Sequence, residues 1–410
     1  MRRVGLRLLV CITLAVSASP LVAENGVVPS PVDRGKYLAT LGNCVSCHTN
    51  AGGALFAGGV AFATPFGIIY STNITPDQET GIGRWTQAQF RRAMREGVRA
   101  DGEHLYPVFP YTAFTKLADG DVDAIYAYVK TLPPVSARPP ENELSFPFNV
   151  RSAVAVWKAW YFDAGRFVAR PDKSVEWNRG AYLVEGLGHC SACHTPRNLL
   201  GAERTDWLLT GGTYQDNIPN GELRRWSAVN LTPAPSGLRA WSSAEIVAYL
   251  KTGLNSFATA FGPMNAVIMN STRHLEDRDA AAIAVYLKGL EAKEQGEAAK
   301  VDAQASRNGE SLYAVHCATC HLPNGQGSID TGPAMVGNPV VQAGDPASLI
   351  NVILHGPQLS DPGPPVQRTH MEAYSNLLSD DEVAALSSFM RSAWGNRGGL
   401  VTASQVAEQR

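Results

Sequence analysis

One short pattern, Cys-x-x-Cys-His, occurs three times in this chain of 410 residues, at 44–48, 190–194 and 317–321. The residues ahead of each copy also repeat, as RGKYL, RGAYL and RNGESLY. After each copy, an acidic residue begins a stretch in which apolar residues recur at spacings of three and four, as they do on one face of a helix. The repeat predicts three small, mainly helical units in series.

The closing helices of the three units are expected at 121–132, 279–290 and 381–393. A Pro-rich stretch (LPPVSARPPENELSFPF) and a polar one (EAKEQGEAAKVDAQAS) separate the units. The expected organisation is a first domain at 24–146, a connector at 147–175, a second domain at 176–291, a linker at 292–306, a third domain at 307–395 and a C-terminal tail at 396–410.

The first 23 residues have the pattern of a secretory signal. A basic start with Arg2, Arg3 and Arg7 precedes a nine-residue apolar core at 8–16, which is too short to span a bilayer. Small residues follow, and cleavage is expected after Ala18 or Ala23. The mature protein is therefore expected in the periplasm.

Residues 150–168 are the most apolar stretch after the signal, but four charged residues interrupt them. We expect an amphipathic helix there, either packed as a connector between domains or lying on a membrane surface. The formal net charge is -2 and no basic run is present, so no nucleic-acid partner is expected.

Two cysteines three apart can form thioethers to both vinyl groups of one haem, and the next residue, histidine, then lies beneath the iron as its proximal ligand. The pattern therefore predicts three covalent c-type haems. The expected iron ligands are His48, His194 and His321, and the expected attachment residues are Cys44, Cys47, Cys190, Cys193, Cys317 and Cys320.

Other uses of these cysteines fit the pattern less well. A redox dithiol does not call for a histidine after each of three copies in an extracytoplasmic chain. A structural zinc site needs four ligands, and no unit contains another cysteine. A disulfide between cysteines this close in sequence would be strained.

The second face of each iron takes methionine or histidine in an electron carrier, and an open position would allow catalysis. In the second unit, Met264 follows a Gly-Pro pair ahead of the closing helix and is the expected distal ligand, with Met269 as the fallback. In the third unit, Met371 is the expected ligand, while Met335 and Met390 are expected in the core.

The first unit differs because its corresponding loop, LYPVFPY at 105–111, holds no methionine. Met94, in a helical stretch, and His104 are the candidates for its distal ligand, and the choice between them, or neither, stays open. His189 and His316 directly precede an attachment cysteine and are expected at the surface or at a haem edge.

The mature chain resembles the triheme cytochrome c subunits of membrane-associated periplasmic dehydrogenases. These serve quinohaem alcohol dehydrogenases, flavin-dependent gluconate, sorbitol and fructose dehydrogenases, and molybdenum aldehyde dehydrogenases. The resemblance is carried by residues 63–85, 104–132, 179–198 and 262–288.

The resemblance implies three tandem class I-type cytochrome c domains with long loops, peripherally attached to the outer face of the cytoplasmic membrane. It also implies His48, His194 and His321 as proximal ligands, with Met264 and Met371 as distal ones. The implied partner is a dehydrogenase large subunit of the pyrroloquinoline quinone (PQQ), flavin or molybdenum type. Many relatives carry methionine where this chain has Phe109, so the chain departs from the family at its first haem.

The expected function is electron transfer from that partner to ubiquinone or a terminal oxidase. No Gly-rich dinucleotide motif and no propeller repeat is present, so the chain is not expected to oxidise a substrate alone and no catalytic residue is predicted. The alternatives are a free-standing periplasmic electron shuttle and a peroxidase-type enzyme that uses an open first haem.

Overall fold

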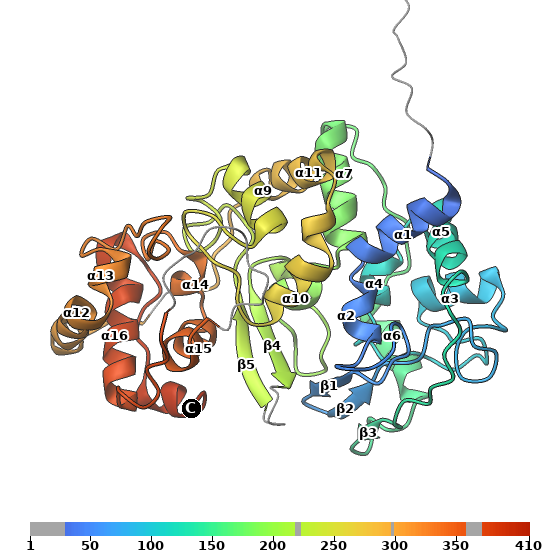
Figure 1. Cartoon of the computed structure of the whole chain (residues 1–410), viewed down its shortest axis with the longest axis horizontal. Helices are drawn as coiled ribbons and strands as arrows, with labels where there is room; N and C mark the ends of the chain where they lie inside the picture. Colours follow the sequence, from blue (N-terminus) through green and yellow to red (C-terminus); the bar gives the residue numbers. More distant parts are fainter. Residues whose placement is uncertain (1–28, 218–222, 297–298, 358–370) are drawn as a thin grey trace, which may run out of the picture.

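The computed structural model describes residues 29–217, 223–296, 299–357 and 371–410, in which helices dominate and the strands form two small sheets. The predicted signal, residues 1–23, lies outside the described residues. Three groups of helices follow one another along the long axis of the molecule, in the order of the sequence (Figure 1). We call them the first, second and third units.

The first unit and the connector after it contain α1 (Pro31–Leu41), α2 (Cys44–His48), β1 (Ala61–Thr64), β2 (Gly67–Tyr70), α3 (Gln87–Glu96), α4 (Tyr111–Phe114), α5 (Asp119–Val129), β3 (Glu143–Leu144) and α6 (Ala153–Tyr161). The strands pair antiparallel in the order β1-β2-β3, with Ala61 opposite Tyr70 and Gly67 opposite Leu144.

The second unit contains α7 (Val175–Tyr182), a π-helical turn (Leu183–Leu187), α8 (Ser191–His194), β4 (Gly212–Asn217), β5 (Leu223–Ala228), α9 (Ser243–Thr252), α10 (Pro263–Asn270) and α11 (Asp277–Lys288), with short 3-10 turns at Thr205–Trp207 and Thr272–His274. The third contains α12 (Ala303–His316), α13 (Ala318–His321), α14 (Pro339–Gln342), α15 (Ala347–His355), α16 (Asp380–Ser392), a 3-10 turn (Ala393–Gly395) and α17 (Ala403–Ala407).

In each unit the opening helix crosses the closing helix, α1 against α5, α7 against α11 and α12 against α16. The two helices of each pair approach each other most closely at a glycine of the opening helix, which is Gly35, Gly180 or Gly309. A Cβ on Gly35 would lie 1.9 Å from the carbonyl oxygen of Ala124, and one on Gly180 would lie 2.0 Å from that of Ala282. Because any side chain would force the helices apart, the repeated glycine gives the three units the same helix pair.

Hydrophobic packing divides the molecule differently from the repeat. One buried cluster runs through the first and second units together, from Leu38 on α1 to Leu287 on α11, and a separate cluster fills the third unit. The third unit meets the second through polar contacts instead. Arg225 on β5 forms an ion pair with Asp345, and the Ser227 amide donates to Ser348 Oγ over 2.9 Å.

The two segments expected as connector and tail are both packed. Nζ of Lys158 on α6 donates to the carbonyls of Glu96 and Gly97, at the C-terminal end of α3, over 2.5 and 2.7 Å. In the expected tail at 396–410, Val401 and Val406 are buried in the core of the third unit. No helix in the described ranges is long and apolar enough to cross a membrane.

Candidate haem-binding sites

Each Cys-x-x-Cys-His copy forms a short helical turn, α2, α8 or α13, soon after the opening helix of its unit. The six motif cysteines are half-buried and none is in a disulfide. The described residues contain no cluster of three or more histidine, cysteine or acidic side chains arranged to hold a metal ion.

The three motif histidines are held in the same way. Nδ1 of His48 donates to the carbonyl of Thr72 over 2.7 Å, and Nδ1 of His194 donates to that of Val229 over 2.7 Å. In the third unit, Nδ1 of His321 lies 2.8 Å from the carbonyl of Pro333. A carbonyl can only accept, so this contact leaves the lone pair on Nε2. A ring fixed in this tautomer is the usual arrangement of a metal-ligating histidine.

Burial favours the neutral form of these rings, because it lowers the pKa of both His48 and His194. Neutral imidazole is the form that binds a metal ion. The chemistry of the donor set therefore fits an iron beneath each histidine.

Burial raises the pKa of the thiols, whereas it lowers that of His48 and His194. It raises the pKa of Cys44, Cys190 and Cys317 to about 12, and that of Cys47 and Cys193 to about 11. A redox dithiol depends on a lowered thiol pKa. These cysteines therefore do not resemble reactive thiolates, in keeping with a role as attachment points.

The carbonyls that hold His48 and His194 are followed by a second repeated sequence, Asn-x-Thr-Pro. This repeat was not among the features predicted from the sequence. Asn73 and Asn230 directly follow these carbonyls, in NITP and NLTP. The Asn73 side-chain oxygen accepts from the amide and hydroxyl of Thr75, and its Nδ2 donates to the carbonyl of Val135 over 2.7 Å. Asn230 makes the same bonds to Thr232 and Lys293. This clamp ties the carbonyl to the chain after the closing helix.

A hairpin leads into each clamp. Strand β2 ends just before the Thr72 carbonyl and β5 just before that of Val229. The hairpins of the two units contact each other through β1 and β4, and Figure 1 shows them next to each other on the lower side of the view, below α10 and α2.

Two buried donors in the second unit support a bound group with acceptor atoms. The indole N–H groups of Trp226 and Trp241 are buried without a hydrogen-bond partner among the described residues. An orphaned buried donor in a native protein calls for a ligand or water that satisfies it. Haem carries two carboxylates, so the second unit fits the group that its motif predicts.

An equivalent backbone hydrogen bond aligns the loops of the first two units that precede the expected distal ligand. The C-terminal ends of α3 and α9 are capped by Gly97 and Gly253, both with positive φ. The carbonyls of these glycines accept from the amides of Leu105 and Ala260.

Four residues after these amides stand Phe109 in the first unit and Met264 in the second. Both side chains are half-buried. Met264 lies in the first turn of α10 rather than on a loop. Phe109 therefore occupies the position that corresponds to Met264.

The other two candidates for the first iron have different surroundings. Met94 is buried in the shared core on α3. Nδ1 of His104 lies 2.9 Å from Nζ of Lys158. Neither stands at the position that corresponds to Met264.

The remaining methionines are distributed between the sites and the core. Met371 is half-buried, and its carbonyl oxygen lies near Gly356, which ends α15 with a positive φ. The Sδ of Met269 accepts from Arg273 over 3.3 Å. Met335 and Met390 are buried in the core of the third unit.

His189 and His316 pack against aromatic rings. The ring of His189 meets Phe114 of the first unit edge-on at 5.5 Å, so His189 lies between the two units. The ring of His316 meets Tyr374 edge-on at 5.8 Å.

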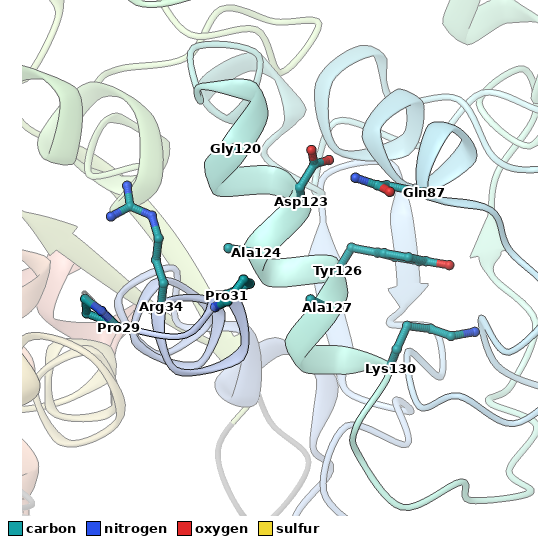
Figure 2. A pocket seen from close by; sticks show the side chains of 10 residues that line it. All are labelled: Pro29, Pro31, Arg34, Gln87, Gly120, Asp123, Ala124, Tyr126, Ala127 and Lys130. Carbon is teal, nitrogen blue, oxygen red and sulfur yellow. The ribbon is translucent and has the colours of Figure 1, made fainter. Parts of the chain in front are cut away.

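An open groove of about 470 Å³ runs along α5, between the starts of α1 and α3 (Figure 2). No residue of a Cys-x-x-Cys-His motif lines it. Its charged side chains are engaged elsewhere, since Arg34 binds Asp121, Asp123 binds Arg91, and Lys130 donates to a backbone carbonyl. The groove is therefore not a second candidate site.

Comparison with known proteins agrees with the motif chemistry. The cytochrome c family matches residues 32–133 and 306–394. The fructose dehydrogenase cytochrome subunit of Gluconobacter japonicus is 37% identical over an alignment of 435 positions, gaps included, which covers 97% of this chain and 88% of that protein. The chain belongs to the family of dehydrogenase cytochrome c subunits.

Two further relatives extend this family. The gluconate 2-dehydrogenase cytochrome c subunit of Pantoea cypripedii is 36% identical over an alignment of 425 positions, which covers 98% of this chain and 94% of that protein. A nicotinate dehydrogenase subunit of Pseudomonas putida is 42% identical over an alignment of 397 positions, which covers 92% of this chain but only 32% of that longer protein. As a dehydrogenase cytochrome c subunit, the chain carries haem c and transfers electrons within a dehydrogenase complex.

Proposed function

We propose that the chain is a triheme electron-transfer subunit, with one haem attached at each Cys-x-x-Cys-His copy in three tandem class I-type cytochrome c domains. The observation that carries this proposal is the shared geometry of the three histidines, each with Nδ1 on a backbone carbonyl. The haems supply one-electron redox chemistry at the iron, while the protein sets access, electrostatics and docking.

The chain's own residues have three roles in this proposal. His48, His194 and His321 would each bind the iron of one haem, with their rings oriented by the carbonyl contacts. Met264 and Met371 would supply the second ligand to the iron in the second and third units. In the first unit, Phe109 replaces the sulfur with a ring that has no lone pair to give to an iron, and this haem is expected to differ from the other two.

Electrons enter from a dehydrogenase large subunit of the PQQ, flavin or molybdenum type and leave to ubiquinone or a terminal oxidase in the cytoplasmic membrane, on its periplasmic side. The support for this route is that two relatives spanning nearly the whole chain are named as the cytochrome subunits of fructose and gluconate dehydrogenases.

The test is reconstitution. The purified chain is expected to show no alcohol, sugar or aldehyde dehydrogenase activity alone, and to permit quinone or cytochrome reduction when its partner is added. Substrate oxidation by the chain alone contradicts the proposal. Full quinone reduction by the chain with several unrelated dehydrogenases favours a free-standing shuttle instead.

Helix α6 supports the proposed contact with the membrane surface, because its charged side chain is buried and its large apolar side chains are exposed. Its one charged residue, Lys158, is 8% exposed, whereas Trp160 is 66% and Val156 is 52% exposed. Residues 146–162 contain no acidic side chain. An exposed aromatic face without carboxylates suits the headgroup region of an anionic bilayer.

Flotation with phosphatidylglycerol-containing vesicles tests this contact. Trp160→Ser is expected to reduce the bound fraction severalfold. The matched control is Val315→Ser, which changes an apolar residue of the third unit that is 73% exposed and is expected to leave binding unchanged. Equal binding of both variants and the wild type contradicts the contact through α6.

A further inference from the structure

The first and second units each bury one carboxylate at the same place in the repeat. Asp121 begins the buried face of α5 and Asp279 that of α11, and their side chains are 5% and 1% exposed. Each binds the arginine of its own opening helix. Nε of Arg34 donates to Asp121 over 2.9 Å, and Nε of Arg179 donates to Asp279 over 2.8 Å.

The tyrosines three residues after these arginines cross between the units. The hydroxyl of Tyr37, on α1, donates to Asp279 of the second unit over 2.8 Å. The hydroxyl of Tyr182, on α7, donates to Asp121 of the first unit over 2.5 Å. Each buried carboxylate is therefore held by the arginine of its own unit and the tyrosine of the other. Such an exchange of equivalent contacts is the signature of a two-fold related pair.

The same interface brings each unit onto the attachment motif of the other. From α10, Asn270 Nδ2 donates to Oγ of Ser46, inside the first Cys-x-x-Cys-His motif, over 2.8 Å. In the reverse direction, the ring of Phe114 on α4 meets that of His189, directly before the second motif. Movement of one unit against the other would therefore displace both motifs.

A buried carboxylate is costly unless its oxygens are hydrogen-bonded, so this arrangement favours one relative orientation of the two units. The third unit lacks the exchange. Its opening-helix tyrosine, Tyr313, donates within its own unit, to the carbonyl of Leu322 over 2.8 Å. The buried core shared by the first two units does not extend into the third either.

We propose that Tyr37 and Tyr182 are positioning residues that fix the first two haem sites relative to each other, so that these two haems act as one electronically coupled pair. The inference rests on the proposed triheme function. The third haem then receives or delivers electrons across the polar contact between β5 and the third unit. Because electron tunnelling falls steeply with distance, a loosened pair would exchange electrons more slowly.

The experiment compares the wild type with Tyr37→Phe, Tyr182→Phe and the double variant, each of which removes only hydroxyl oxygens. Haem content is counted first, by the pyridine haemochrome assay. The circular-dichroism couplet of the Soret band then reports haem–haem orientation, and a potentiometric titration resolves the individual potentials. The controls are Tyr126→Phe, whose hydroxyl donates within the first unit, and Tyr313→Phe.

The double variant is expected to retain three haems, lose at least half of the couplet amplitude and change the separation of two of the three potentials. The single variants are expected to show smaller changes in the same direction, and they carry the test if the double variant does not fold. Tyr126→Phe is expected to match the wild type in couplet and potentials, and Tyr313→Phe, whose hydroxyl also lies 3.3 Å from the carbonyl of His321, is expected to match it in couplet amplitude. Unchanged couplet and potentials in the tyrosine variants, or a wild type with no couplet, overturn the inference. A wild type with fewer than three haems overturns the proposed function instead.

Discussion

The first and second units share a scaffold and differ at the position that would face the iron. In both units, the glycine that caps a helix, Gly97 after α3 or Gly253 after α9, accepts a hydrogen bond from a backbone amide of the following loop. Both hold the motif histidine through a carbonyl fixed by an Asn-x-Thr clamp. At the corresponding position, however, the first unit has Phe109 and the second has Met264. The scaffold is thus repeated, while the residue proposed to bind the iron is not.

The largest effect is expected from removing the two motif cysteines of one unit, because the whole haem of that unit should be lost. Cys190→Ala together with Cys193→Ala is expected to leave two haems of three, because the other motifs have their own cysteines and histidine. Mass spectrometry of the mature protein counts the haems. Loss of all three would show that the units do not mature independently.

Truncating Met264, the proposed distal ligand of the second unit, is expected to have the next largest effect. Thioether sulfur favours ferrous iron, so Met264→Ala is expected to lower one haem potential by on the order of 0.1 V, within the range of about 0.8 V that axial ligands span. The sulfur-to-iron absorption feature of one ferric haem should vanish with it.

The matched control for this variant is Phe109→Ala, which truncates the corresponding side chain of the first unit. It is expected to leave that absorption feature intact. If Met264→Ala changes no haem, the distal assignment in the second unit is wrong.

The reverse change would make the first unit like the second. Phe109→Met is expected to give the first haem a sulfur ligand, with a rise in one potential and a stronger sulfur-to-iron feature. Met94→Ala and His104→Ala, made separately in the wild type, test the two residues that sequence reasoning left open. Magnetic circular dichroism follows all three variants. If the wild type already shows three methionine-ligated haems and Met94→Ala removes one, the two units do not differ in the way proposed.

The smallest effect is a pH dependence of the interface between the first two units. Burial raises the pKa of Asp279, but the hydrogen bonds from Arg179 and Tyr37 outweigh it, so the net pKa is below the ordinary value of 3.8. A depressed folded-state pKa contributes stability that is present above the unfolded value and lost as pH falls through the folded value.

The free energy of unfolding of the wild type is therefore expected to fall below about pH 4, by at most about 3 kcal/mol for a hydrogen-bonded buried charge. Thermal melting at a series of pH values measures this loss. Asp279→Asn should be less stable at pH 6 and should lose less of its stability on acidification. A variant that responds to acid as strongly as the wild type would assign the effect to other carboxylates.

The repeated motifs and their helices could be predicted because they depend on local pattern. The closing helices expected at 121–132 and 279–290 are observed at Asp119–Val129 and Asp277–Lys288. Cysteine spacing and the histidine next to it are likewise local properties. They led to haem c before any tertiary contact was known, whereas the resemblance to the family rested on the longer segments at 63–85, 104–132, 179–198 and 262–288.

The contacts that complete the sites join residues far apart in the sequence, and their partners could not be predicted. The carbonyl that holds His194 comes from Val229, at the end of a hairpin that was not expected. The bond from Tyr37 to Asp279 spans 242 residues. The repeated NITP and NLTP segments were a usable signal for the clamps, but only the structure shows that they fix the carbonyls beneath the histidines.

We propose that each of the three motifs binds one haem covalently, and intact-mass spectrometry of the purified protein tests this most directly. The predicted result is a mass equal to that of the processed chain plus three haems, with no thiol left to react with an alkylating reagent. A mature protein with fewer than three haems, or with a free motif cysteine, would contradict the account.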